Sequence, residues 1–187
     1  MILCYIWGAK HTQINKHNIA VTSTAFRYVS QNHYPLALLR HSFMIKAHQI
    51  KLNPTMLQEK LLRQSCGVAR FSFNWALHKW QEDYKNGIRQ SAYSLIKHLN
   101  SIKRKEFPWM QETGKTCSQY AIHNVEAAYK RMWKEKAGYP KFKKKGVKDS
   151  FVAVENWRKF KQNDFKIHIP RIGKIKCAEN LRFEGKV

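Results

Sequence analysis

The sequence predicts an α+β fold in which short strands flank a central group of helices. Three observations carry this prediction. A short β-type run, Met44–Leu52, comes first, and apolar residues at helical spacing follow it as far as Lys136. After Gly138, short β-type runs return, separated by turn residues. This order indicates a β platform that is interrupted by a helical insertion. The sequence contains no internal repeat.

The composition indicates a folded protein that binds polyanions. The chain has 187 residues, of which 43% are hydrophobic and 13% aromatic, so it has enough apolar surface for a core. No run approaches the roughly 18 apolar residues of a transmembrane helix. Lys and Arg number 35 against 12 Asp and Glu, which gives a net charge of +23. Nucleic acid is the partner that this excess favours, and an anionic membrane surface is the weaker alternative.

The first 43 residues differ from the rest of the chain. They contain four basic residues and no acidic one, and they show neither a helical period nor strand alternation. We expect this segment to be an unstructured extension, translated from upstream of a true start at Met44, and a functional arm is the less favoured alternative. Because no Lys or Arg precedes its apolar opening, it makes a poor secretory signal.

The four cysteines lie far apart along the chain, at positions 4, 66, 117 and 177. A structural zinc site usually contains a Cys pair two to four residues apart, and this sequence has none. Reduced thiols in a cytoplasmic protein are therefore expected.

The first helical region reads as two helices with a break between them. Asn53 is expected to cap the first helix and Pro54 to lie in its first turn. Cys66-Gly67 is expected to interrupt the helix, and Asn86-Gly87 to end the second. Apolar residues at helical spacing define the two faces: Leu57, Leu61 and Leu62 in the first helix, and Phe73, Leu77, Trp80 and Tyr84 in the second.

Two helices joined by a tight turn fit a helix-turn-helix whose second helix enters the DNA major groove. Polar side chains available on that helix are Ser72, Asn74, His78 and Lys79. The same pattern fits an ordinary αα-hairpin in a bundle, and from the pattern alone the hairpin is favoured.

Further elements follow in order. A third helix is expected from Ser91, a break at Phe107–Trp109, and a fourth helix over Cys117–Lys136. Three strands are expected after it, at Ser150–Val154, Asp164–Ile169 and Ile172–Cys177, with Asn163 and Gly173 as turn residues.

The segment from Lys130 to Lys148 is the strongest candidate for a nucleic-acid contact. It holds nine basic residues against the single acid Glu135, and Trp133, Tyr139 and Phe142 are interleaved with them. Lysines neutralise phosphates, and aromatic faces stack on unpaired bases. Trp133 is expected in the core because it adjoins Met132, whereas for Tyr139 and Phe142 core and base contact both stay open.

No catalytic or metal site is predicted. The five histidines after Met44 pair with no other His or Cys at metal-ligand spacing, and the acids are scattered. The sequence contains neither a Gly-rich phosphate loop nor a nucleophile elbow. The chain is therefore expected to perform no catalysis by itself and to carry no cofactor.

Several stretches, taken together and in order, resemble the N-terminal half of the OrfB/TnpB proteins of bacterial and archaeal insertion sequences. They are MIKAHQIKLNPT, RFSFNWAL, FPWM, AGYPKFK, KDSF, IHIPRIGKIKC and RFEGKV. The resemblance covers residues from about Met44 to Val187, and the first 43 residues match nothing in the family.

The resemblance implies a transposase-associated, RNA-guided DNA endonuclease, in whose family this region is described as a helix-turn-helix domain. Guide RNA and target DNA are the implied partners, and base pairing would then carry the sequence readout. The implied architecture is a wedge-type β-barrel interrupted by a helical recognition domain. The implied parts are an extension (1–43), a first wedge strand (44–54), the recognition domain (55–137), a basic linker (138–149) and a second wedge segment (150–187).

Several residues match family positions. Lys115 and Gln119 match residues that contact a motif beside the target, although a plain helix start explains them equally well. Arg70 and Asn74 match an Arg-Phe-x-x-Asn element, for which backbone bonding is at least as plausible as RNA contact. The nucleic-acid-binding residues predicted in total are Arg70, Asn74, Lys115, Gln119, Lys130, Lys134, Tyr139, Lys141, Phe142, Lys143, Lys144 and Lys145.

Full-length relatives continue with a nuclease domain and a zinc ribbon, so Mg²⁺ and Zn²⁺ are expected only in a C-terminal half that this sequence lacks. A truncated or frameshifted element, bound to the bacterial or archaeal nucleoid, would explain this. The rival hypotheses are a stand-alone repressor that binds DNA without cutting it, and a general basic RNA-binding protein.

Overall fold

The computed structural model describes residues 3–12, 43–154 and 165–180, with side chains from residue 49 onward. These residues form two compact units, and each is described by itself. The first unit comprises residues 3–12, 43–52, 165 and 177–180, and the second comprises residues 53–154 and 166–176. The combination of helices with an antiparallel sheet confirms the predicted α+β class.

The first unit is built around two paired strands, β1 (Leu3–Thr12) and β2 (Phe43–Asn53). They run antiparallel, with Leu3 opposite Lys51 and an irregularity between Trp7 and Lys10. β2 confirms the predicted first strand: Ile50 and Leu52 are buried, whereas the residues between and beside them are exposed.

The prediction that the N-terminal 43 residues lack structure is wrong for Leu3–Thr12, while residues 13–42 lie outside the described part of the chain. The segment begins with an unbroken apolar run, so the alternation that marks a half-buried strand was not visible in it. Its pairing with β2 supplies the hydrogen bonds that the strand needs.

Two further strands, β3 (Lys166–Ile169) and β4 (Gly173–Cys177), run antiparallel to each other. The nitrogen of Ala178 donates to the oxygen of Lys51 at 2.9 Å, and that of Cys177 donates to the oxygen of Phe165 at 2.7 Å. The described strands thus form antiparallel pairs, and no closed barrel is present among the described residues.

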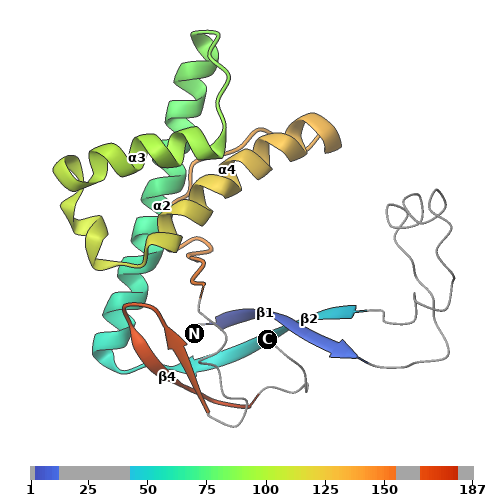
Figure 1. Ribbon diagram of the computed structural model, residues 1–187, viewed down its shortest axis with the longest axis vertical. Coiled ribbons are helices and arrows are strands. Elements are labelled where there is room, and N and C mark those ends of the chain that lie inside the picture. Colours follow the sequence, from blue (N-terminus) through green and yellow to red (C-terminus); the bar gives the residue numbers. More distant parts are fainter. Residues whose placement is uncertain (1–2, 13–42, 155–164, 181–187) are drawn as a thin grey trace, which may run out of the picture. The chain divides into compact units, whose positions relative to one another are not determined.

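The longest element of the second unit is α2 (Met56–Lys85), a single helix of 30 residues (Figure 1). The predicted break at Cys66-Gly67, and with it the pair of helices joined by a turn there, is wrong. Buried residues continue on one face through the glycine: Leu62, Ser65, Val68, Ala69, Ser72 and Phe73. One helical glycine costs only about 1 kcal/mol relative to alanine, which the packing of this face outweighs.

The start of α2 also differs from the prediction. The N-cap is Thr55, whose hydroxyl accepts from the nitrogen of Gln58, and the Gln58 side chain accepts from the nitrogen of Thr55. This reciprocal capping box places Asn53 at the end of β2 and Pro54 before the cap, so neither has its predicted role. Asn86 ends the helix as predicted, and Gly87 follows with φ +73°.

Two further helices pack with α2, and they confirm the predicted third and fourth helices. α3 (Ala92–Glu106) begins one residue after the expected start, because Ser91 is its N-cap, and a 3₁₀ turn, η2 (Pro108–Glu112), lies at the predicted break. α4 (Lys115–Glu135) starts two residues earlier than expected and ends with Lys136 in the left-handed conformation.

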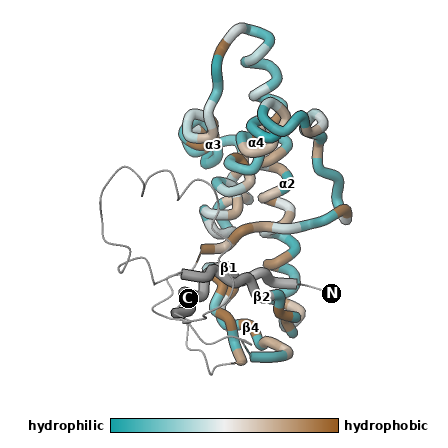
Figure 2. Tube along the Cα trace, turned by 90° about the vertical axis from the view of Figure 1, so that its right-hand side faces the viewer, coloured by the Kyte–Doolittle hydropathy of each residue, from teal (hydrophilic) through white to brown (hydrophobic). Residues whose placement is uncertain are grey.

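The core of the second unit lies between α2, α3 and α4. Its fully buried side chains include Val68 and Leu77 from α2, Leu95 and Leu99 from α3, and Ile122 and Val125 from α4. The colours of Figure 2 alternate along each helix between hydrophilic and hydrophobic, as expected where one face packs inward. Of the predicted apolar stripes, Leu57 and Tyr84 are the exceptions, because both are exposed.

The hairpin β3–β4 also belongs to this unit, apart from Cys177. It pairs Ile167 with Ile175 and turns through Arg171 and Gly173, both of which have positive φ. The predicted strand Ser150–Val154 is wrong, because these residues form no ladder. Phe151 packs against the helical core instead. Asn163, the expected turn residue, lies outside the described residues.

Candidate nucleic-acid interface

The predicted basic linker lies against α2 as an irregular segment without helix or strand. We call residues Tyr139–Asp149 the basic loop. The side-chain amide of Asn74 holds it: Nδ2 donates to the backbone oxygen of Lys143 at 3.0 Å, and Oδ1 accepts from the nitrogen of Lys143 at 2.8 Å. One side chain thus satisfies both backbone groups of a single loop residue, which fixes the loop on the helix.

Arg70 provides a second attachment one helical turn earlier. Its Nη1 donates to Oδ1 of Asp149 at 2.6 Å, and the other oxygen of that carboxylate accepts from the nitrogen of Gly146 at 3.1 Å. The ion pair is partly exposed, so it adds little to the stability of the protein. Its main effect is to hold the end of the loop in place on α2. Both residues therefore hold the loop on α2: Asn74 bonds its backbone and Arg70 bonds a loop carboxylate, and neither bonds backbone across a helix pair.

The lysines of the basic loop do not all face solvent equally. Lys143 is half-buried, and its Nζ lies 4.6 Å from the centroid of the Phe73 ring. Burial lowers the pKa of Lys143, although the nearby Asp149 carboxylate opposes that shift. Lys141, Lys144, Lys145 and Lys148 are exposed. These four exposed ammonium groups are the ones available to phosphates.

The C-terminal half of α4 adds further charge next to the loop. Lys130 and Lys134 are exposed, as are Arg131 and Lys136. Lys130 pairs with Glu126 one turn earlier, at 3.3 Å. Tyr139 and Phe142, whose roles the sequence left open, are both exposed aromatics at the start of the loop.

Lys115 and Gln119 lie at the other end of α4. Lys115 is exposed in the first turn, and Gln119 is half-buried one turn later. At 1.5 Å per residue, the 15 positions from Lys115 to Lys130 correspond to about 22 Å along the axis. Lys115 and Gln119 therefore lie well apart from Lys130 and Lys134 along α4, while Arg70 and Asn74 contact the loop itself.

A groove of about 400 Å³ runs along one face of α2. Its lining follows helical spacing: Gly67, Arg70, Phe71, Asn74, Trp75 and His78. Of the polar residues considered for a recognition helix, Ser72 is fully buried, and Lys79 pairs with Glu82 and Asp83. Neither is therefore placed to read a base edge.

The described residues offer little for other chemistry. Residues 3–12, 43–154 and 165–180 contain no group of His, Cys, Asp or Glu arranged to hold a metal ion. In the same ranges, no helix has both the length and the apolar character that crossing a bilayer requires. Burial raises the pKa of the Cys117 thiol to about 11, which keeps it protonated and a poor nucleophile near neutral pH.

Two residues of the interface were missed or misplaced by the sequence reasoning. Trp133, expected in the core, is 57% exposed, although its ring stacks on that of Tyr129. Asp149 was not considered, although a lone acid at the end of a run of lysines was a readable signal for an internal partner.

Comparison with known proteins supports the resemblance found in the sequence. Residues 44–89 match a family model described as a helix-turn-helix domain, of the OrfB type. The chain is 27% identical over 148 residues to a putative RNA-guided DNA endonuclease, InsQ, of Escherichia coli (strain K12), covering 76% of this chain and 36% of that relative. It is also 26% identical over 113 residues to the virulence protein VsdF of Salmonella dublin, covering 54% of this chain and 95% of the relative.

These matches confirm the resemblance to the N-terminal region of the OrfB/TnpB proteins. The family match begins at residue 44, where the predicted family region begins, and it covers β2 and α2. The chain spans about a third of the length of InsQ, so the activity in that relative's name belongs to a much longer protein.

Proposed function

Proceeding from this match to the OrfB helix-turn-helix region, we propose that the chain is a nucleic-acid-binding module of a transposase-related protein. The basic loop and the C-terminal half of α4 form its phosphate-binding surface. The finer part of the proposal is that the nucleic acid is a guide RNA together with its target DNA, as the name of InsQ suggests for that relative. The strands would then act as part of a wedge domain around the helical insertion.

One observation supports this proposal most strongly, namely the way α2 holds the basic loop. A run of lysines without anchors is usually a solvated segment whose charges move independently. Here Asn74 and Arg70 fix the loop at two points, so its exposed lysines keep a defined spacing. Positions fixed in advance lower the entropy cost of contacting a phosphate backbone.

The chemistry of this surface is binding and not cleavage. Exposed lysines and aromatics supply electrostatic attraction and stacking, whereas metal-dependent hydrolysis needs clustered carboxylates. We therefore propose no catalytic role for the described residues, and no cofactor. If a nuclease acts with this module, Mg²⁺ and Zn²⁺ would belong to that other part.

The proposal is tested by the salt dependence of binding to a structured RNA and to duplex DNA. The triple variant Lys141→Ala, Lys144→Ala, Lys145→Ala is compared with a matched variant that removes three exposed lysines elsewhere: Lys60, Lys97 and Lys105. If three phosphate contacts are lost, the slope of log affinity against log salt should fall by about 2–3 for the loop variant only. Equal slopes in the wild type and both variants would exclude the loop from the interface.

A further inference from the structure

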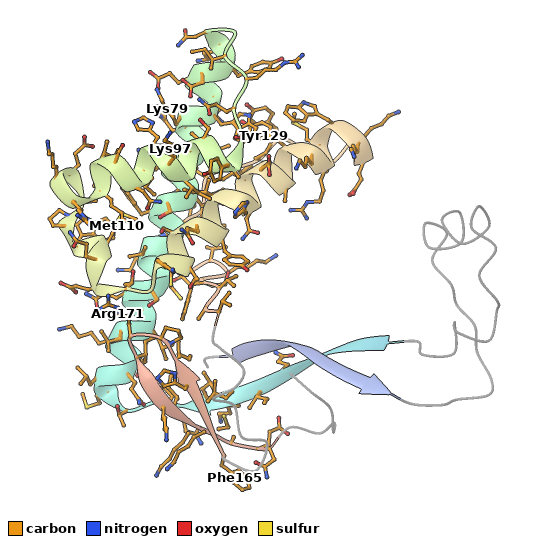
Figure 3. The ribbon with its side chains drawn as sticks, in the orientation of Figure 1. Lys79, Lys97, Met110, Tyr129, Phe165 and Arg171 are labelled. Carbon is orange, nitrogen blue, oxygen red and sulfur yellow. The ribbon has the colours of Figure 1, made fainter. Side chains whose placement is uncertain are left out.

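Three aromatic rings from two helices form a continuous column in the second unit. Trp80 of α2 stacks on Tyr129 of α4, with ring centroids 5.0 Å apart and planes at 18°. Tyr129 in turn stacks on Trp133, with centroids 5.5 Å apart and planes at 28°. Tyr129, labelled in Figure 3, comes from the C-terminal half of α4, and Trp133 follows one turn later on the same face.

The column changes from buried to exposed along its length. Trp80 and Tyr129 are 5% and 3% exposed, whereas Trp133 is 57% exposed. Tyr129 stacks on one face of the Trp133 ring, and Trp133 is still 57% exposed, so much of the rest of the indole is in contact with solvent. The column therefore ends in a flat, rigidly supported indole surface. A single exposed apolar side chain is common and needs no explanation, so the argument rests on what surrounds this one.

Tyr139 packs edge-on against Tyr129, the middle ring of the column. Its hydroxyl lies 3.2 Å from that of Tyr129, and the two rings are perpendicular, at 89° with centroids 5.9 Å apart. Burial and this hydrogen bond raise the pKa of Tyr129, which keeps the phenol neutral. Tyr139 is itself 55% exposed. One buried ring thus orients two exposed rings at the start of the basic loop.

The chain on either side of Trp133 is positively charged. Arg131 and Lys134 in the last turns of α4 and Lys136 just after it are exposed, and Glu135 is the only acid between Lys130 and Lys148. A flat aromatic face next to several cations suits a nucleotide, whose base stacks while its phosphate is neutralised. The bases of a duplex already stack on one another, so an unpaired base is the partner that fits an end face of this kind.

We propose that the outer face of Trp133 is a stacking platform for one unpaired base of a single-stranded nucleic acid. This inference rests on the proposed nucleic-acid binding by the basic loop, and it adds a base contact to a surface otherwise made of phosphate contacts. The platform is indifferent to base identity, because every base has a π face.

The test compares two RNA oligonucleotides of equal length and charge, one with ten adenines and one in which every nucleotide is abasic. The full chain is titrated with each, as wild type and as Trp133→Ala. Loss of the platform should weaken binding of the adenine oligonucleotide roughly 5- to 100-fold, as for one lost base–aromatic stack. Binding of the abasic oligonucleotide should hardly change.

Three further variants separate stacking from folding. Trp133→Leu keeps an apolar contact with Tyr129 but has no π face, so it should lose affinity as the alanine variant does. Trp133→Phe should keep most of it. Trp109→Ala removes another partly exposed tryptophan, 42% exposed and edge-on to Phe71, and should bind both oligonucleotides as the wild type does.

The outcomes distinguish the two proposals. If the wild type binds both oligonucleotides and the alanine and leucine variants at position 133 match it, the platform is excluded and phosphate binding stands. A wild type that binds neither oligonucleotide would overturn the proposed function together with the platform. A selective loss for the adenine oligonucleotide in those two variants, absent in Trp109→Ala, supports the platform.

Discussion

At the scale of the residue, Asn74 shows how one side chain positions a segment that is distant in sequence. Its amide bonds both the nitrogen and the oxygen of Lys143, 69 residues away. In Asn74→Ala these two half-buried backbone groups lose their partners. We expect the free energy of unfolding to fall by about 1–3 kcal/mol, measured by urea unfolding. RNA affinity should fall too, because the basic loop is no longer held on α2.

A matched control is Asn100→Ala on α3. Asn100 is exposed, and its Oδ1 accepts a hydrogen bond from Lys103 within the same helix. Its removal should change stability by no more than about 0.5 kcal/mol. If Asn74→Ala were as stable as this control, the paired hydrogen bonds would not be what fixes the loop.

The sequence showed that the interface would contain lysines and aromatic residues, but it did not show which residues contact one another. The run of lysines was plain in the sequence, whereas the partners of Arg70 and Asn74 lie 79 and 69 residues away and had no local signal. Trp133 was expected in the core because it follows Met132 in sequence. Its position is set instead by Tyr129, four residues earlier on the same helical face.

At the scale of the element, the continuity of α2 is the main departure from the sequence prediction. Gly67 lies inside the helix, and a Cβ built on it would meet no atom within 4 Å. Gly67→Ala should therefore stabilise the protein by about 0.5–1 kcal/mol, because alanine loses less backbone entropy in a helix. Thermal unfolding should show an increase in Tm of about 1–4 °C.

Gly87 provides the opposite case. It has φ +73°, a left-handed conformation that a Cβ disfavours, so Gly87→Ala should destabilise the protein by about 1–2 kcal/mol. The pair of variants also tests the two readings of residues 44–89. A destabilising Gly67→Ala would indicate a turn at Cys66-Gly67, as the helix-turn-helix description implies, and would argue against one continuous helix.

Most elements followed from local patterns, and those that did not depend on partners. Ser91 and Asn86 marked real helix ends, because their chemistry acts within one turn. The break at Cys66-Gly67 failed because one glycine is a weak signal against a long buried face. β1 was missed, and a strand was expected at Ser150–Val154, because strand formation depends on a pairing partner that local sequence does not reveal.

At the scale of the whole molecule, the N-terminal segment and the basic loop belong to different units, which makes their roles separable. Deleting Met1–Phe43 removes four basic residues and no acidic one, so the general attraction for polyanions falls only modestly from its net charge of +23. The loop and its anchors are untouched. We expect RNA affinity to stay within about twofold of the wild type, with an unchanged salt slope.

The same deletion should have a separate cost in the first unit. It removes β1, whose pairing with β2 covers the backbone groups along that edge. An uncovered strand is a template for pairing with another chain, so the shortened protein should aggregate at lower concentration, as measured by light scattering. A large loss of affinity in the monomeric fraction, with helical content retained by circular dichroism, would mean that the N-terminal segment itself contacts nucleic acid.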